Sequence, residues 1–150
     1  MSFNKNSNQK GFTIVELLIV IVVIGILAAI TIVAYNSIQN RGKIASAQAA
    51  ANTVIKKAEA ANAIASSYPV DIAGFAAQSD SSLAGSGITL GSVATVPAKP
   101  ATVQYFACSA TSGAGAKVQY WDFTANAAST AVTIGGACTT YSTTALSQAY

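Results

Sequence analysis

The longest apolar run in this chain sets the strongest limit on its fold. Between Leu17 and Tyr35 there are 19 residues without a single charged side chain, and most of them are Leu, Ile, Val or Ala. As an α-helix the run would extend roughly 28 Å, at about 1.5 Å per residue. Crossing the hydrocarbon core of a bilayer takes about 20 residues. The run therefore predicts a membrane helix.

Two features stand directly before this run. Glu16 places a carboxylate at its N-terminal end, and Gly11-Phe12 precede it in a Lys10-Gly-Phe-Thr-Ile-Val-Glu16 sequence. A carboxylate is costly in lipid, although the cost is lower near the end of a span, where the side chain approaches the interface. One interpretation is that Glu16 merely marks the edge of the span. The functional interpretation gives it a cationic partner.

The segment from Lys10 to Tyr35 resembles the N-terminus of type IV pilins and of the related pseudopilins. The resemblance covers 26 of the 150 residues. It implies that a leader ends at Gly11, that a prepilin peptidase cuts between Gly11 and Phe12, and that the new terminal amine of Phe12 is N-methylated. It also implies that Glu16 pairs with the Phe12 amine of a neighbouring subunit during assembly. The family usually has a proline at the position of Val33, and without it we expect a more continuous helix.

Two other interpretations compete for the N-terminal run. A secretory signal peptide has an apolar region of about 7–15 residues followed by a small-residue cleavage site. The run here is longer and carries Glu16 near its start. An ordinary single-pass anchor needs only the apolar run, but it leaves Gly11-Phe12 and Glu16 unexplained.

Charge and composition argue against several function classes. The formal charge is +3, from eight basic and five acidic residues, and removal of residues 1–11 with Lys5 and Lys10 reduces it to +1. The basic character is therefore no nucleic-acid signature. With no histidine and two cysteines, Ser-His-Asp and Cys-His arrangements are excluded, and most metal sites with them. Phosphate-binding glycine loops do not occur. We therefore expect no enzyme, no cofactor, no metal site and no small-molecule substrate.

The pattern divides the chain into four segments: a leader (1–11), a transmembrane or filament-core helix (12–35), an amphipathic half of the same helix (36–68) and a β-rich head (69–150). Residues 36–43 contain Gly42 and form the weakest part of the predicted helix. Small and aliphatic residues then recur every three or four positions. These are Ile44, Ala47, Ala51, Val54, Ile55, Ala58, Ala61 and Ile64. The helix should end near Ser66, because Pro69 follows.

The remainder of the chain is predicted to form a small sheet. Residues 71–96 look rich in loops, with a short strand starting at 88–90, and Pro97 and Pro100 bound a linker. Residues 102–108, 117–123 and 131–134 are rich in β-formers, and 112–115 read as the hairpin loop between the first two. We expect the α+β class, with three or four antiparallel strands packed on the helix stripe. Aromatics of these strands are more often core than an adhesive surface. They are Tyr105, Phe106, Trp121 and Phe123.

Cys108 and Cys138 are the only two cysteines, and both lie in the predicted exported head. An even pair in an exported domain favours a disulfide. The bond would close a loop of about 30 residues, worth roughly 3–4 kcal/mol in the chain-entropy account. The alternative is two buried free thiols.

Together these observations favour a structural subunit of a type IV pilus-like filament. The expected partners are further copies of the chain, the prepilin peptidase, a pilus assembly platform and motor, and the membrane before assembly. A surface ligand or DNA is a further candidate. The precursor would cross the cytoplasmic membrane once, with its head outside the cytoplasm, and then enter a surface pilus. Two alternatives stay open: a minor pilin or pseudopilin of a type II secretion or DNA-uptake machine, and a membrane-anchored binding domain that does not polymerise.

Overall fold

The computed structural model describes residues 11–93, 99–109 and 113–149. The chain forms two compact units, Met1–Ile38 and Gln39–Tyr150. One long helix contributes to both units. In the second unit, a short helix and a six-stranded sheet accompany the C-terminal part of the long helix.

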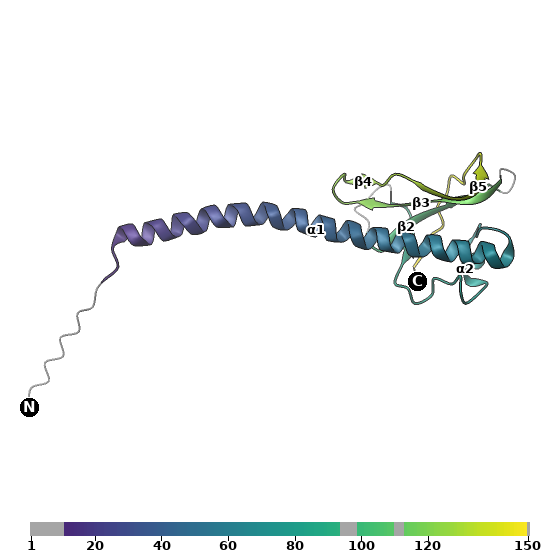
Figure 1. Cartoon of the computed structure of the whole chain (residues 1–150), viewed down its shortest axis with the longest axis horizontal. Coiled ribbons are helices and arrows are strands. Elements are labelled where there is room, and N and C mark those ends of the chain that lie inside the picture. Colours follow the sequence, from purple (N-terminus) through teal and green to yellow (C-terminus); the bar gives the residue numbers. More distant parts are fainter. Residues whose placement is uncertain (1–10, 94–98, 110–112, 150) are drawn as a thin grey trace, which may run out of the picture. The chain divides into compact units, whose positions relative to one another are not determined.

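Helix α1 runs from Ile14 to Ala65 without interruption (Figure 1). The expected weak stretch at 36–43 is helical throughout, and so is the region around Val33, where the proline of the family pattern is absent. The helix ends where Ser66 adopts a left-handed backbone with φ 55°. Pro69 follows shortly, as is common after a helix end.

The C-terminal part of α1 buries a narrow stripe made mostly of alanine. Small side chains here let the helix backbone lie close to the sheet. The buried residues are Ala47, Ala50, Ala51, Val54, Ala58 and Ala61. Ile64, which the pattern placed on this stripe, is instead 49% exposed in the last turn. The stripe confirms the predicted amphipathic half of the helix.

Six strands form the sheet in the order β4-β3-β2-β1-β6, with β5 also paired to β3. All pairs are antiparallel except β1 with β2. The strands are β1 (Thr89–Leu90), β2 (Thr102–Ala107), β3 (Gly113–Asp122), β4 (Ala127–Ala128), β5 (Val132–Cys138) and β6 (Gln148–Ala149). The α+β class with a small, mainly antiparallel sheet is confirmed.

Several details differ from the sequence expectation. The sheet has six strands instead of three or four. Strand β1 coincides with the short strand expected at 88–90, whereas the two-residue strands β4 and β6 are too short to leave a pattern in the sequence. The helix α2 (Ile72–Ala76) lies in the stretch expected to be loop. Gly113–Gly115 belong to β3, although this stretch was expected in a hairpin loop, and β5 continues through Gly135 and Gly136 beyond the strand expected at 131–134. The predicted loop residue 112 and the linker residue Pro97 lie outside the described residues.

The two glycine segments meet each other across the sheet. Gly115 is opposite Gly135, next to a shift in the β3–β5 register. Gly135 has φ +84°, and a Cβ there would overlap the Tyr68 ring and lie 2.8 Å from the Cα of Gly115. These glycines therefore allow two strands and a tyrosine ring to approach more closely than larger residues would.

The core of the second unit lies between α1, α2 and the sheet. Phe75 of α2 packs edge-on against Tyr105 of β2, with ring centroids 5.0 Å apart. Aliphatic side chains from the loop and the strands complete the cluster. They include Leu83, Ile88, Leu90, Val103, Val118 and Ile134. The sheet and the C-terminal part of α1 are thus joined by one apolar cluster.

Candidate assembly site

Helix α1 begins with a reciprocal set of hydrogen bonds between Thr13 and Glu16. The backbone N–H of Thr13 and its hydroxyl both donate to Glu16 Oε2, each at 2.8 Å. The backbone N–H of Glu16 donates to Thr13 Oγ1 at 3.2 Å. This arrangement is a capping box, in which the first helical residues satisfy each other's free donors. It holds the carboxylate at the very start of the apolar helix.

The predicted cleavage position lies immediately before this cap. Gly11 is exposed, and a Cβ placed on it would meet no atom within 4 Å. The next residue, Phe12, is 88% exposed. In this chain the backbone between Gly11 and Phe12 is therefore open to an approaching protein.

Beyond Glu16 the helix presents apolar side chains on every side. From Leu17 to Ile38 the exposed fractions of the large apolar side chains run from 47% at Val23 to 72% at Val33. It is the one helix of the described residues that is long and apolar enough to cross a membrane. Such a surface needs lipid or other apolar helices around it, because a helix that is hydrophobic all round is a buried or membrane-spanning one.

The capping box is the feature of this site that pattern reasoning overlooked. Its signal is present in the sequence as Thr13-Ile14-Val15-Glu16, which fits the S/T-x-x-E motif before an apolar run. Glu16 therefore has a local role as a helix cap in addition to the assembly role that the resemblance implies. Thr13 is the residue that positions it.

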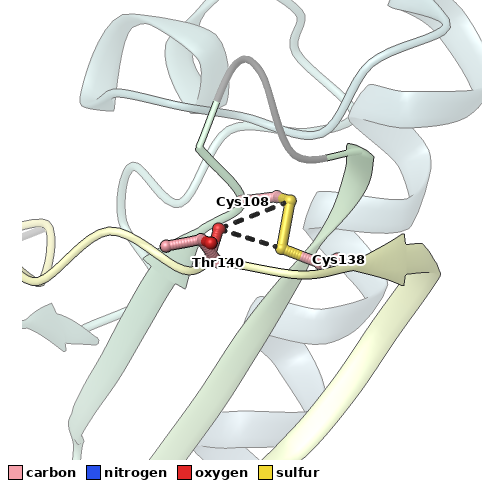
Figure 2. The surroundings of a disulfide bond; sticks show 3 residues. All are labelled: Cys108, Cys138 and Thr140. Carbon is pink, nitrogen blue, oxygen red and sulfur yellow. Dashed lines mark hydrogen bonds between the residues drawn. A yellow bond between two sulfur atoms is a disulfide. The ribbon is translucent and has the colours of Figure 1, made fainter.

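In the second unit, Cys108 and Cys138 form a disulfide, as expected for an exported head (Figure 2). It joins the residue after β2 to the last residue of β5, 30 positions along the chain. The carbonyl oxygen of Thr140 lies 3.2 Å from Cys138 Sγ and 3.8 Å from Cys108 Sγ. Disulfide sulfurs carry no hydrogen, so these are contacts of a carbonyl with the bond and not hydrogen bonds.

The segment after the disulfide runs along the edge of β2. The backbone N–H of Ser109 donates to Thr140 O, that of Ser142 donates to Ala107 O, and that of Leu146 donates to Tyr105 O. Leu146 also packs against the core. The tail thereby covers the part of β2 that the two-residue strand β1 leaves free. The disulfide fixes the start of this covering segment.

The aromatic residues of the strands divide between the core and the surface. Tyr105 is fully buried and Trp121 is 7% exposed, as the core interpretation predicted. Phe106 and Phe123 are half-buried and lie under lysines instead. Lys117 Nζ is 4.4 Å from the Phe106 ring centroid, and Lys43 Nζ is 5.6 Å from that of Phe123. Such cation–π contacts occupy ring faces that an adhesive patch would need free.

A small groove opens between α1 and the sheet within the second unit, with a volume of about 240 Å³. Its lining combines polar and apolar side chains, and Gln48 Nε2 donates to Tyr120 Oη at 2.9 Å. The lining residues are Gln48, Ala51, Asn52, Ile55, Tyr120 and Val132. The groove carries no charged side chain.

Comparison with known proteins finds similarity in the N-terminal segment. A family model of the prokaryotic N-terminal methylation motif matches residues 6–32. The type IV major pilin protein PilE1 of Neisseria gonorrhoeae is 48% identical over 42 residues, which are 28% of this chain and 26% of that protein. A fimbrial protein of Neisseria meningitidis serogroup B is 48% identical over 42 residues, 28% of this chain and 25% of that protein. No solved structure matches the chain.

The matched segment spans about a quarter of the length of these curated relatives. It contains Gly11, Phe12, Thr13 and Glu16, and the capping box at the start of α1 lies within it. The chain is thus similar to type IV major pilins over 42 residues, and it carries the prokaryotic N-terminal methylation motif at residues 6–32.

Proposed function

We propose that this chain is the structural subunit of a type IV pilus-like filament. The observation that carries the proposal is the methylation motif at residues 6–32, which includes the start of a helix whose N-terminal part exposes apolar side chains on all sides. In type IV pilins, a motif of this kind occurs together with such a helix. The exposed surface would lie in the membrane before assembly and against other copies of the helix afterwards.

The proposed processing removes residues 1–11. A prepilin peptidase would cut between Gly11 and Phe12 and methylate the amine of Phe12. The open backbone at Gly11 supports this assignment, because a peptidase must reach that bond. The mature chain would then begin at Phe12, directly before the cap formed by Thr13 and Glu16.

The proposed role of Glu16 is to set the register between subunits. In the full-length chain its carboxylate accepts two hydrogen bonds from Thr13. The amine of a processed Phe12 on a neighbouring copy would add an opposite charge in an apolar environment. Such a pair is favourable there only when both charges are together, so an incoming subunit would be held at one position.

The helix and the disulfide support the proposed location. The precursor would span the cytoplasmic membrane once, with the second unit outside the cytoplasm, and then enter the pilus. The Cys108–Cys138 bond supports an exported head, because disulfides persist in oxidising compartments. The peptidase, an assembly platform and a motor are the proposed partners. In this role the chain catalyses no reaction.

The test is mass spectrometry of filaments sheared from the cell surface. We expect a dominant filament protein that begins at N-methylated Phe12 and is two hydrogens lighter than the reduced chain. Trace amounts of the processed chain in filaments, or its confinement to the membrane, would favour a minor pilin or pseudopilin. A chain that keeps residues 1–11 would contradict the proposal and leave a membrane-anchored domain.

A further inference from the structure

Both edges of the sheet are strands that pair on one side only. Among the described residues, β4 and β5 each pair with β3 alone, and β6 pairs with β1 alone. Natural sheets usually protect such edges with charged side chains, because unpaired backbone groups recruit further strands. Here both edge strands come from residues 123–150, a stretch without any charged side chain. The charged side chains that soluble domains often place at sheet edges are therefore absent from both of these strands.

The hydrogen-bond pattern identifies which groups of β5 face outward. Cys108 N donates to Gly115 O, so the backbone groups of Gly115 face β2. Alternation along an antiparallel ladder directs those of Ala116 and Val118 to the other side, toward Ile134 and Val132. The backbone groups of Thr133 therefore point away from the sheet, and its side chain is exposed.

The same reasoning identifies the outward groups of β6. Thr89 N donates to Ala101 O and Gly91 N to Val103 O, so both residues face β2. Leu90 then faces β6, where its partner is Gln148. The backbone groups of the flanking Ser147 therefore point away from the sheet.

The strand directions make these two edges compatible. β5 runs antiparallel to β3, whereas β6 runs in the same direction as β3, through β2 and β1. A second copy in the same orientation, shifted along the sheet, would thus bring β6 beside β5 as an antiparallel pair. Because the two edges differ, this contact repeats without closing, as in an open filament.

We propose that β6 of one copy adds to the free edge of β5 of the next copy, with Ser147 opposite Thr133. This inference rests on the proposed filament function and adds a contact between heads to the packing of the N-terminal helices. In this register Gln148 lies beside Val132, on the α1 face of the sheet. Its amide would then reach the uncharged groove, which is lined by the amides of Gln48 and Asn52.

The direct test is cysteine cross-linking in filaments sheared from cells that make the full chain. Within one copy, positions 133 and 147 lie on opposite sheet edges, four strand spacings or about 19 Å apart, too far for a disulfide. We therefore expect the double variant Thr133→Cys with Ser147→Cys to give a ladder of multimers that collapses on reduction. The matched control is the double variant Thr133→Cys with Ala63→Cys, in which position 63 is exposed on α1. This variant should stay monomeric.

Single variants distinguish the possible arrangements. Co-expressed Thr133→Cys and Ser147→Cys chains should form mixed dimers, and neither variant alone should form any. Dimers of Thr133→Cys alone would indicate a two-fold β5–β5 contact and would overturn the proposal. Filaments of the double variant without cross-links would overturn edge pairing and leave the filament function intact. If the wild-type chain forms no filaments, the filament function fails as well.

A second variant keeps the test valid if the cysteines disturb assembly. Thr133→Pro removes the outward N–H without removing a bond to β3, as proline is tolerated at sheet edges. We expect a loss of filaments for Thr133→Pro, normal filaments for Thr133→Val, and unchanged thermal unfolding of both full-length variants in detergent. Normal filaments from Thr133→Pro would contradict the proposal. So would an equal loss in Thr133→Val.

Discussion

The environment of Tyr105 changes the pKa of its phenol. Its side chain is fully buried, and among the described residues its hydroxyl finds no hydrogen-bond partner. Burial raises the pKa of the Tyr105 phenol well above its ordinary value, and the nearby Tyr68 adds to the shift. The phenol therefore stays neutral in the folded chain, even where an exposed tyrosine would ionise.

This burial predicts a loss of stability at alkaline pH. Above about pH 10 the unfolded chain releases the Tyr105 proton while the folded chain keeps it, so the free energy of unfolding falls as pH rises. Tyr105→Phe should remove this part of the fall. At neutral pH the same variant should be equally stable or about 1 kcal/mol more stable, since no bonded group is lost.

Thermal unfolding of the full chain in detergent at pH 7 and above pH 10 measures both effects. Tyr120→Phe is the control, because its hydroxyl accepts a hydrogen bond from Gln48. That variant should lose stability at neutral pH. Equal alkaline sensitivity in wild type and Tyr105→Phe would disprove the assignment.

Gly135 is the second residue whose role depends on its surroundings. Its φ of +84° and its contact with Tyr68 predict that Gly135→Ala costs about 2–4 kcal/mol, from backbone strain plus steric overlap. Gly87 supplies the matched control, since it has φ +70° but open space around it. Gly87→Ala should therefore cost only the strain, about 1–2 kcal/mol. Urea unfolding of both variants gives the comparison, and equal losses would show that the overlap with Tyr68 and with the backbone of Ala114 and Gly115 is unimportant.

At the scale of elements, the disulfide holds the tail against β2. The double variant Cys108→Ser with Cys138→Ser should lower the free energy of unfolding by roughly 3–4 kcal/mol in the chain-entropy account. It should also free the tail before the rest of the head unfolds. The amides of Ser142 and Leu146, which donate to β2, would then exchange faster with solvent.

Hydrogen exchange of the full chain in detergent checks this prediction. Amides in the centre of β3 provide the internal reference, because β2 and β5 still flank that strand. Uniformly faster exchange in β3 and in the tail would mean that the bond stabilises the whole head and not the tail in particular.

At the scale of the whole molecule, assembly should depend on the carboxylate of Glu16. Glu16→Ala removes both the charge and the cap, so we expect a strong loss of surface filaments while the chain still inserts into the membrane. Thr13→Ala is the informative companion, because it removes the hydroxyl of the cap and leaves the charge. It should reduce filaments less than Glu16→Ala does. Filament yield and membrane content are measured by immunoblotting of sheared and membrane fractions.

The relative effects of these two variants separate the roles of Glu16. Equal losses would mean that capping the helix is its main contribution. Unchanged filaments in Glu16→Ala would exclude assembly through this residue.

The parts of this protein that the sequence determined alone are those encoded by neighbouring residues. The apolar helix, the Gly11-Phe12 and Glu16 motif and the alanine stripe of α1 all depend on short spacings along the chain. The α+β class and the disulfide could also be predicted from the sequence. Strand patterns and an even number of cysteines can be recognised without knowledge of the fold.

Tertiary structure decided whatever depends on distant residues meeting. A short strand was expected at 88–90, but its parallel pairing with β2 and the two-residue edge strand β6 became visible only in the sheet. Gly115 was expected in a hairpin loop, and only strand pairing placed it opposite Gly135, where a Cβ would overlap the Tyr68 ring. The free edges of β5 and β6 are also a property of the tertiary structure, because a strand is an edge only when no other strand lies beside it. Local spacing cannot encode that absence.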